Sequence, residues 1–274
     1  MITIQDFTGV YTEQPFMQKL RESAAFDKEI RWFDCTQIDG TDCYCDDEAQ
    51  AILREQIESV NGEKNFGIHF FDNGNYHYMS KLWTDCIQEP FNLVVFDHHP
   101  DMQPPRFEGI LSCGGWIKEV LDHNKFVQNV IVIGVADHLV EEIREDLSQA
   151  NSAEILSRVT FIRENELHSI SSHISHFTSL SSSLYISIDK DALSPAYAAT
   201  NWDQGSLTYN QLADILIAFA QNHRILGIDI CGERARDMGF EDTTAADALN
   251  NALNEKLYNL ITTLVERRFP PSRE

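Results

Sequence analysis

The chain has 274 residues, of which 43% are hydrophobic and 23% are charged. This length suffices for one large α/β domain with a substantial core. Lys and Arg number 21 and Asp and Glu number 43, so the formal net charge is −22, which favours cationic ligands and argues against nucleic acid as a partner. No apolar stretch is long enough to span a membrane, and we expect no membrane partner.

The six cysteines are scattered along the chain and form no Cys-x-x-Cys pair. They fit free thiols in a reducing compartment better than a disulfide framework. No basic and then apolar leader follows Met1. We therefore expect a cytoplasmic protein.

The first clear elements in chain order are a helix over 46–60 and a strand over 66–71. The helix is predicted because acidic residues begin it and apolar residues recur on one face. The strand leads into a turn, residues 72–78, that carries a single histidine, His77. Taken alone, such a histidine is more often a surface or hydrogen-bonded residue than a metal ligand. Residues 1–60 are expected to add a strand and helices.

The most informative stretch follows the next apolar run, residues 91–96. Asp97, His99 and Asp101 come directly after this run at spacing i, i+2 and i+4, which sends them to one side of an extended chain. A polar loop after a strand is the simpler interpretation. However, three ligand-type side chains crowded together repel one another unless a cation lies between them.

Further strands are predicted over 128–135, 159–163 and 184–188. The serine-rich and histidine-rich stretch 168–183 is expected to form a helix with a serine-rich loop. The strand 184–188 ends at Asp189-Lys190-Asp191, where two carboxylates again follow a strand at spacing i, i+2. By itself this pattern is usually a solvated turn.

A capped amphipathic helix is predicted over 208–221, and a strand over 225–230 that ends at Cys231-Gly232-Glu233. Alternating strands and helices indicate an α/β fold. In open α/β sheets, sites form outside the carboxyl ends of the strands. Four strand ends that carry ligand-type residues are difficult to explain by solvation alone.

With these motifs in this order, the chain resembles the ureohydrolase family of arginase, agmatinase and formiminoglutamase. The family carries a Gly-Gly-Asp-His-type histidine, an Asp-x-His-x-Asp motif and an Asp-x-Asp-x-x-(Asp)-Pro motif. The corresponding residues are His77, then Asp97, His99 and Asp101, then Asp189 and Asp191 with Ser194-Pro195 following. The resemblance covers about residues 66 to 235. It implies a three-layer, mostly parallel doubly wound sheet, with residues 1–274 forming a single arginase-like metallohydrolase domain.

The resemblance also implies two divalent cations per chain. One would take His77, Asp97, Asp101 and Asp189; the other would take His99, Asp97, Asp189 and Asp191. Asp97 and Asp189 would then bridge, and an oxygen-rich donor set favours Mn²⁺ over Zn²⁺. A hydroxide shared by the two metals would attack the guanidinium carbon and release urea and an amine. Asp191 would pass a proton to the leaving nitrogen.

Departures from the family pattern affect the proton shuttle. The histidine that arginases carry after the Asp-x-His-x-Asp motif is missing from residues 111–116. His98 and His138 are then the candidate shuttles, although a structural role is the more common one for such histidines.

Departures also affect the substrate residues. Gly134 to Leu139 corresponds to the family segment that holds the α-amino group of free arginine; Asp137 is retained, but Leu139 replaces the final aspartate. Glu233 follows one residue later than the family's guanidinium-binding glutamate. Asp203 is a second candidate for that role. Trp116 and Trp202 could line a wide pocket mouth, although tryptophans near a site are more often packing residues.

A retained metal site without the groups that bind free arginine fits a hydrolase of arginine side chains in a peptide, which become ornithine. The substrate would then be a guanidino group, in the peptide case on a ribosomally made peptide. The alternative is a small guanidino compound, free arginine or agmatine. A zinc deacetylase-like amidohydrolase and a non-catalytic ligand-binding relative are rivals. Two Mn²⁺, one Zn²⁺ or no metal per chain would separate these interpretations. A homo-oligomer is compatible with all of them.

Overall fold

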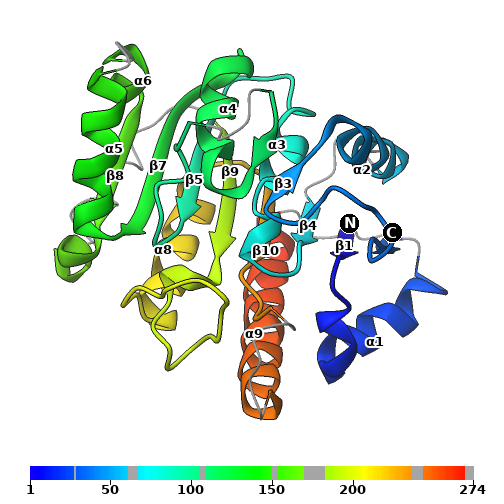
Figure 1. The fold of residues 1–274 in the computed structure, drawn as a ribbon. Coiled ribbons are helices and arrows are strands. Elements are labelled where there is room, and N and C mark those ends of the chain that lie inside the picture. Colours follow the sequence, from blue (N-terminus) through cyan, green and yellow to red (C-terminus); the bar gives the residue numbers. More distant parts are fainter. Residues whose placement is uncertain are drawn as a thin grey trace.

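The centre of the computed structural model is an eight-stranded sheet in the order β2-β1-β4-β10-β9-β5-β7-β8 (Figure 1). Every neighbouring pair in it is parallel. Its strands are β1 Ile2–Asp6, β2 Ile30–Asp34, β4 Gly67–Phe70, β5 Phe91–Phe96, β7 Val127–Val135, β8 Val159–Arg163, β9 Ser183–Asp189 and β10 Ile225–Cys231. A short antiparallel pair consists of β3 Tyr44–Cys45 and β6 Leu111–Ser112. The structure describes residues 1–27, 29–60, 67–104, 109–149, 153–169, 183–235 and 243–268.

Helices cover both faces of the sheet (Figure 1). One hydrophobic cluster packs one face against α1 Pro15–Ala24, α8 Tyr209–Asn222 and α9 Thr244–Arg268. A second cluster packs the other face against α2 Asp47–Val60, α3 Met79–Thr84, α4 Trp116–His123 and α5 Asp137–Gln149. The short α6 Ala153–Ser157 lies beside α5 and β8. The prediction of a three-layer, mostly parallel doubly wound sheet is confirmed.

The central strands are mostly apolar because they are buried on both faces. In β5, Leu93 and Val95 belong to the second cluster, whereas Val94 and Phe96 belong to the first. The side chains therefore alternate between two cores, and the run 91–96 contains no solvent-facing position.

The predicted elements match the structure closely. The bounds of β5 and β8 coincide with the predicted 91–96 and 159–163. Helix α8 begins after Thr208, whose side chain accepts a hydrogen bond from the backbone of Gln211 in a capping box. The predicted helix and loop over 168–183 lie mostly outside the described residues. At the start of this stretch, residues 164–169 form a 3₁₀ helix.

The sheet order places the candidate ligands together. Strands β4, β10, β9 and β5 are neighbours, and their carboxyl ends meet at one edge of the sheet because the strands are parallel. At this edge Cys231 of β10 is in register with Asp189 of β9. The turn that carries His77 and the loop 97–101 begin at the same edge.

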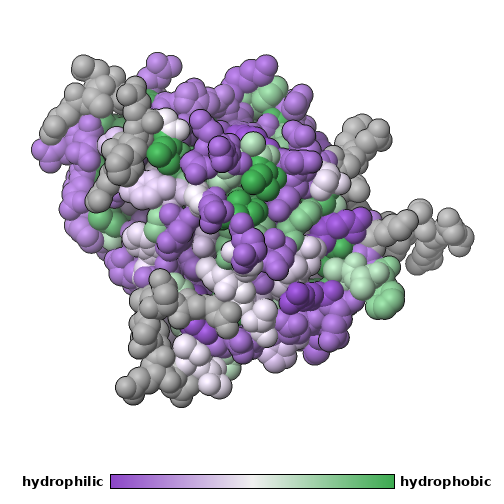
Figure 2. Space-filling model, turned by 45° about the vertical axis from the view of Figure 1, so that its right-hand side comes forward, coloured by the Kyte–Doolittle hydropathy of each residue, from purple (hydrophilic) through white to green (hydrophobic). Residues whose placement is uncertain are grey.

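The molecular surface in Figure 2 is mainly hydrophilic, with apolar side chains in small separate patches. Among the described residues, the exposed large hydrophobic side chains are Phe26, Ile52 and Trp202. None of the helices in the described part of the chain is long and apolar enough to cross a membrane.

Candidate metal centre

A pocket of about 430 Å³ opens at the carboxyl edge of the sheet. All six predicted metal ligands line it: His77, Asp97, His99, Asp101, Asp189 and Asp191. The other lining residues are Gly74, Pro100, Gln103, Cys113, Gly114 and Trp202. The pocket therefore unites residues from three separate strand ends and brings four carboxylates and two imidazoles together.

One half of the centre forms around His77. Its Nδ1 lies 3.0 Å from Oδ2 of Asp101, 3.2 Å from Oδ2 of Asp97 and 3.5 Å from Oδ2 of Asp189. A single ring nitrogen carries at most one proton and cannot satisfy three carboxylate oxygens. Accordingly, Oδ2 of Asp97 is buried and accepts no hydrogen bond among the described residues. A divalent cation between these atoms would satisfy them, so the residues fit a metal.

The other half forms around His99. Its Nδ1 lies 3.0 Å from Oδ2 of Asp191 and 3.4 Å from Oδ1 of Asp97. Oδ1 and Oδ2 of Asp97 thus face the two histidines separately, one oxygen toward each. Ligand-type atoms of His77, Asp97 and Asp101, and of Asp97, His99 and Asp191, form groups in which all atoms lie within 4.8 Å of one another. Asp97 is common to both groups, as a bridging ligand would be.

Four carboxylates share the pocket with two histidines, and the buried aspartates raise one another's pKa. Burial, reinforced by the charge of Asp191, raises the pKa of Asp189 to about 7. Burial and the charge of Asp97 raise the pKa of Asp191 to about 6. For His99, burial opposes protonation, but hydrogen bonds to Asp191 and Asp97 raise its pKa above the ordinary value. Crowded carboxylates bind protons when no metal ion is present to balance them.

A hydrogen-bond chain on the side of the ring away from the carboxylates fixes the orientation of His77. Its Nε2 lies 2.8 Å from Oγ of Ser187, and that hydroxyl donates to Oδ1 of Asp229 at 2.6 Å. Because the single hydroxyl proton of Ser187 goes to Asp229, Nε2 of His77 must be the protonated nitrogen. Nδ1 then directs its lone pair at the carboxylates, which is the orientation of a metal ligand supported by an outer hydrogen bond.

Ser187→Ala is expected to weaken metal binding by roughly 10- to 100-fold, because Nε2 of His77 loses its hydrogen-bond acceptor and the ring loses its orientation. Isothermal titration of the metal-free protein with Mn²⁺ measures this change. Ser59→Ala, on the exposed end of α2, is the control and should bind as the unmodified protein does. Equal affinities for the two variants would show that Ser187 does not orient the ring.

The tryptophans differ in role. Trp116 is fully buried and its Nε1 donates to Oδ2 of Asp101 at 2.7 Å, so it supports a ligand and does not form the mouth. Trp202 is 40% exposed and lines the pocket. Only Trp202 therefore agrees with the expectation of an aromatic mouth.

The structure does not place Glu233 in the pocket. Its carboxylate is fully buried, forms an ion pair with Lys190 and accepts hydrogen bonds from Gln14 at 2.8 Å and Asn254 at 2.7 Å. Both carboxylate oxygens thus have partners in the protein interior. Glu233 therefore does not line the pocket, and its contact with a guanidinium stays a prediction.

Two other predicted residues also lie away from the pocket lining. His98 is buried, with Nδ1 3.2 Å from the carbonyl of Gly134. Asp137 begins α5 and accepts a hydrogen bond from Asn165. Neither residue is among those that line the pocket.

Asp203 is the predicted substrate residue that reaches the centre. Its Oδ1 lies 3.0 Å from Nε2 of His99, and its side chain is 70% exposed. A carboxylate on the outer nitrogen of a ligand histidine fixes the tautomer, here leaving Nδ1 for a metal. Burial raises the pKa of Asp203, but the hydrogen bond with His99 and the charge of that ring outweigh burial and lower the pKa.

Sequence reasoning missed the residues that support the ligands. Ser187 and Asp229 are polar residues inside otherwise apolar strands, two positions before Asp189 and Cys231 respectively. Alternation along each strand places each pair on the same face. A polar side chain two residues before a strand-end ligand was therefore a usable signal.

The fold and the pocket together define an α/β protein with a candidate two-metal centre. Residues 20–248 match the model of the Arginase family. The chain therefore belongs to the arginase family, whose members are hydrolases that act on guanidino C–N bonds.

Individual relatives agree with this assignment. Over 234 residues the chain is 28% identical to an uncharacterized protein of Thermotoga maritima, covering 85% of this chain and 79% of that protein. The agmatine ureohydrolase of Thermoplasma volcanium superposes with a TM-score of 0.64 at 14% identity, covering 98% of this chain and 90% of the other. The arginase from Bacillus caldovelox gives 0.61 at 14% identity, covering 92% and 97%. These two structures share the fold.

Proposed function

We propose that this protein is a two-metal hydrolase that releases urea from a guanidino substrate, and that its preferred substrate is arginine in a peptide, which becomes ornithine. The observation that carries this proposal is the pair of histidine–carboxylate groups that share Asp97 at the pocket. Four carboxylates against two imidazoles favour Mn²⁺ as the metal.

When bound, the metal pair would supply an activated water for attack on the guanidinium carbon. The remaining tasks fall to the chain itself. Asp191, at the pocket wall, would accept a proton at a carboxylate oxygen and return it to the leaving nitrogen. Asp203 would hold Nε2 of His99 through Oδ1 and offer Oδ2 to a cationic group of the substrate. The ring of Trp202 would cover the aliphatic part of the arginine side chain.

The preference for peptidyl arginine rests on the segment where the family holds the α-ammonium group. Leu139 is partly buried against the second hydrophobic cluster and offers no carboxylate there. The nearby Asp137 accepts a hydrogen bond from Asn165 and does not line the pocket. An unpaired α-ammonium costs about 1–3 kcal/mol, which corresponds to roughly 5- to 150-fold. An arginine whose amino group is in a peptide bond does not incur this cost.

Urea release measured with Mn²⁺-loaded protein on an arginine peptide, agmatine and free arginine tests the proposal. We expect the peptide to have the highest kcat/KM and free arginine to be roughly 5- to 150-fold lower. A peptide of the same sequence with lysine in place of arginine is the control and should yield no urea. Highest activity on free arginine would contradict the substrate assignment.

The deacetylase alternative is tested in the same assay. An acetyl-lysine peptide hydrolysed by the Zn²⁺-loaded protein, without urea from any guanidino compound, would replace the proposed reaction. A protein that binds no metal and hydrolyses neither type of peptide would be the non-catalytic relative.

A further inference from the structure

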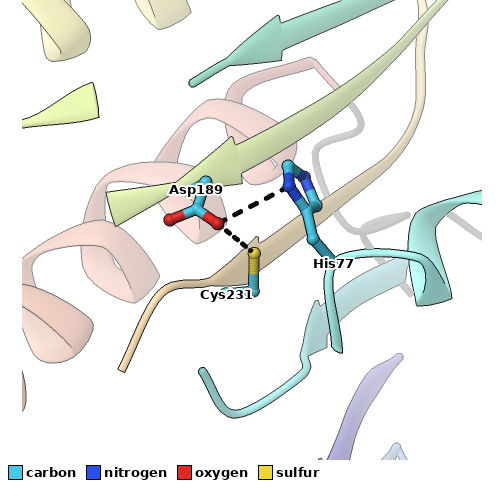
Figure 3. A group of neighbouring side chains, drawn as sticks. All are labelled: His77, Asp189 and Cys231. Atoms are coloured by element: carbon cyan, nitrogen blue, oxygen red, sulfur yellow. Dashed lines mark hydrogen bonds and ion pairs between the residues drawn. The ribbon is translucent and has the colours of Figure 1, made fainter. Parts of the chain in front are cut away.

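A third group of ligand-type residues borders the half-site of His77 and includes a cysteine. Figure 3 shows His77, Asp189 and Cys231 pointing toward one another from three different segments. Sγ of Cys231 lies 3.2 Å from Oδ2 of Asp189, and Nδ1 of His77 lies 3.5 Å from the same oxygen. All three side chains are buried, and their ligand atoms lie within 4.8 Å of one another.

The position of the thiol is set by the sheet. Cys231 is the last residue of β10 and is in register with Asp189 on the neighbouring strand. Ile228 and Ile230 enter the first hydrophobic cluster, so alternation sends Cys231 to the other face, beside Asp189. After it the chain turns at Gly232, which has φ +89°. The sulfur is therefore held at the centre by two paired strands.

A second observation indicates that this position binds an ion. Oδ2 of Asp97, from a side chain that is 1% exposed, faces Nδ1 of His77 and accepts no hydrogen bond among the described residues. The unsatisfied oxygen and the thiol approach the same histidine from different strands. His77 is common to the group with Asp97 and to the group with Cys231, so nitrogen, oxygen and sulfur donors all lie close to its ring.

We propose that Cys231 is a sulfur ligand to the metal ion at His77, and that this half-site therefore prefers a borderline ion such as Zn²⁺ or Co²⁺ over Mn²⁺ more strongly than the half-site of His99 does. The inference deepens the proposed function and rests on its metal centre. Thiolate ligands select softer ions, and carboxylates with imidazole accept harder ones. On binding, the Sγ proton is released to solvent and a metal–sulfur bond forms.

X-ray absorption of Zn²⁺-loaded protein tests the bond directly. The inference predicts a sulfur scatterer at about 2.3 Å from the metal. Cys113→Ser is the matched control, because Cys113 lines the same pocket but belongs to none of the ligand groups. The sulfur signal should persist in Cys113→Ser and disappear in Cys231→Ser. A first shell with only nitrogen and oxygen in the unmodified protein overturns the inference without any variant.

Competition between metals tests selectivity. Protein loaded with Mn²⁺ and then given about one equivalent of Co²⁺ per chain should take up Co²⁺ first at the half-site of His77, and show the near-ultraviolet sulfur-to-cobalt absorption. In Cys231→Ser that absorption should vanish and the preference for Co²⁺ over Mn²⁺ should fall at least about tenfold. An unchanged preference would reduce Cys231 to a hydrogen-bond donor for Asp189. Urea release without a sulfur signal overturns only this inference, whereas a sulfur signal without urea release overturns only the proposed reaction.

Discussion

Replacing Asp97 by asparagine is expected to remove both metal ions and to abolish urea release. One oxygen of this carboxylate lies 3.2 Å from Nδ1 of His77 and the other lies 3.4 Å from Nδ1 of His99, so both half-sites lose a charged ligand in one substitution. The loss of affinity should exceed the roughly 10- to 100-fold caused by removing an outer hydrogen-bond partner. Metal content of purified, Mn²⁺-reconstituted protein should fall from about two ions per chain to nearly none.

Replacing a ligand that belongs to only one half-site should lower the metal content by a smaller amount. Asp101→Asn affects only the His77 half-site and Asp191→Asn only the His99 half-site, so each should lower the metal content by about one ion. Asp137→Asn removes the same charge from a carboxylate that does not line the pocket, and it should leave the metal content unchanged. Two ions retained in Asp97→Asn would show that Asp97 does not bridge the half-sites.

The sequence predicted the fold and the residues that line the pocket because both depend on local patterns. Apolar runs buried on two faces mark central strands, and carboxylates at spacing i, i+2 mark their ends. Parallel pairing then brings Asp97 and Asp189 to the same edge. The prediction required no knowledge of loop geometry, because parallel pairing of the strands alone brings these side chains together.

His98 lies beside the pocket and does not line it. Its Nδ1 lies 3.2 Å from the carbonyl of Gly134, and its Nε2 lies 3.8 Å from Oδ2 of Asp203, whose Oδ1 contacts His99. A shuttle role for His98 stays a prediction. Strand alternation could not place Asp203, because a loop and not a strand carries it to the two histidines.

The location of Glu233 depends on a turn that spacing does not reveal. Gly232 has φ +89°, and a Cβ there would lie 2.3 Å from Oδ1 of Asp189, so a side chain at this position is excluded. The carboxylate one residue later leaves the strand end in another direction and meets Lys190. Glu233 therefore pairs with Lys190 and does not line the pocket.

Lys190 lies between Asp189 and Asp191 in the sequence, yet its positive charge does not neutralise these two aspartates. Its side chain is fully buried and its Nζ is paired with Glu233, whereas Asp189 and Asp191 on either side line the pocket. The ammonium charge therefore balances Glu233 and leaves the negative charge of the pocket for metal ions. Removing Lys190 alone would leave Glu233 charged and buried, with the side-chain amides of Gln14 and Asn254 as its remaining partners.

Lys190→Met is accordingly expected to lower the free energy of unfolding by about 3–5 kcal/mol, the cost of a buried pair that loses one partner. Urea unfolding followed by circular dichroism measures it. The double variant Lys190→Met/Glu233→Gln should recover most of the loss, because a neutral amide can still bond to Gln14 and Asn254. Lys118→Met removes the more exposed pair with Asp122 and should cost less than about 1 kcal/mol. If the double variant were as unstable as Lys190→Met, lost packing of the lysine stem and not an unpaired charge would be the cause.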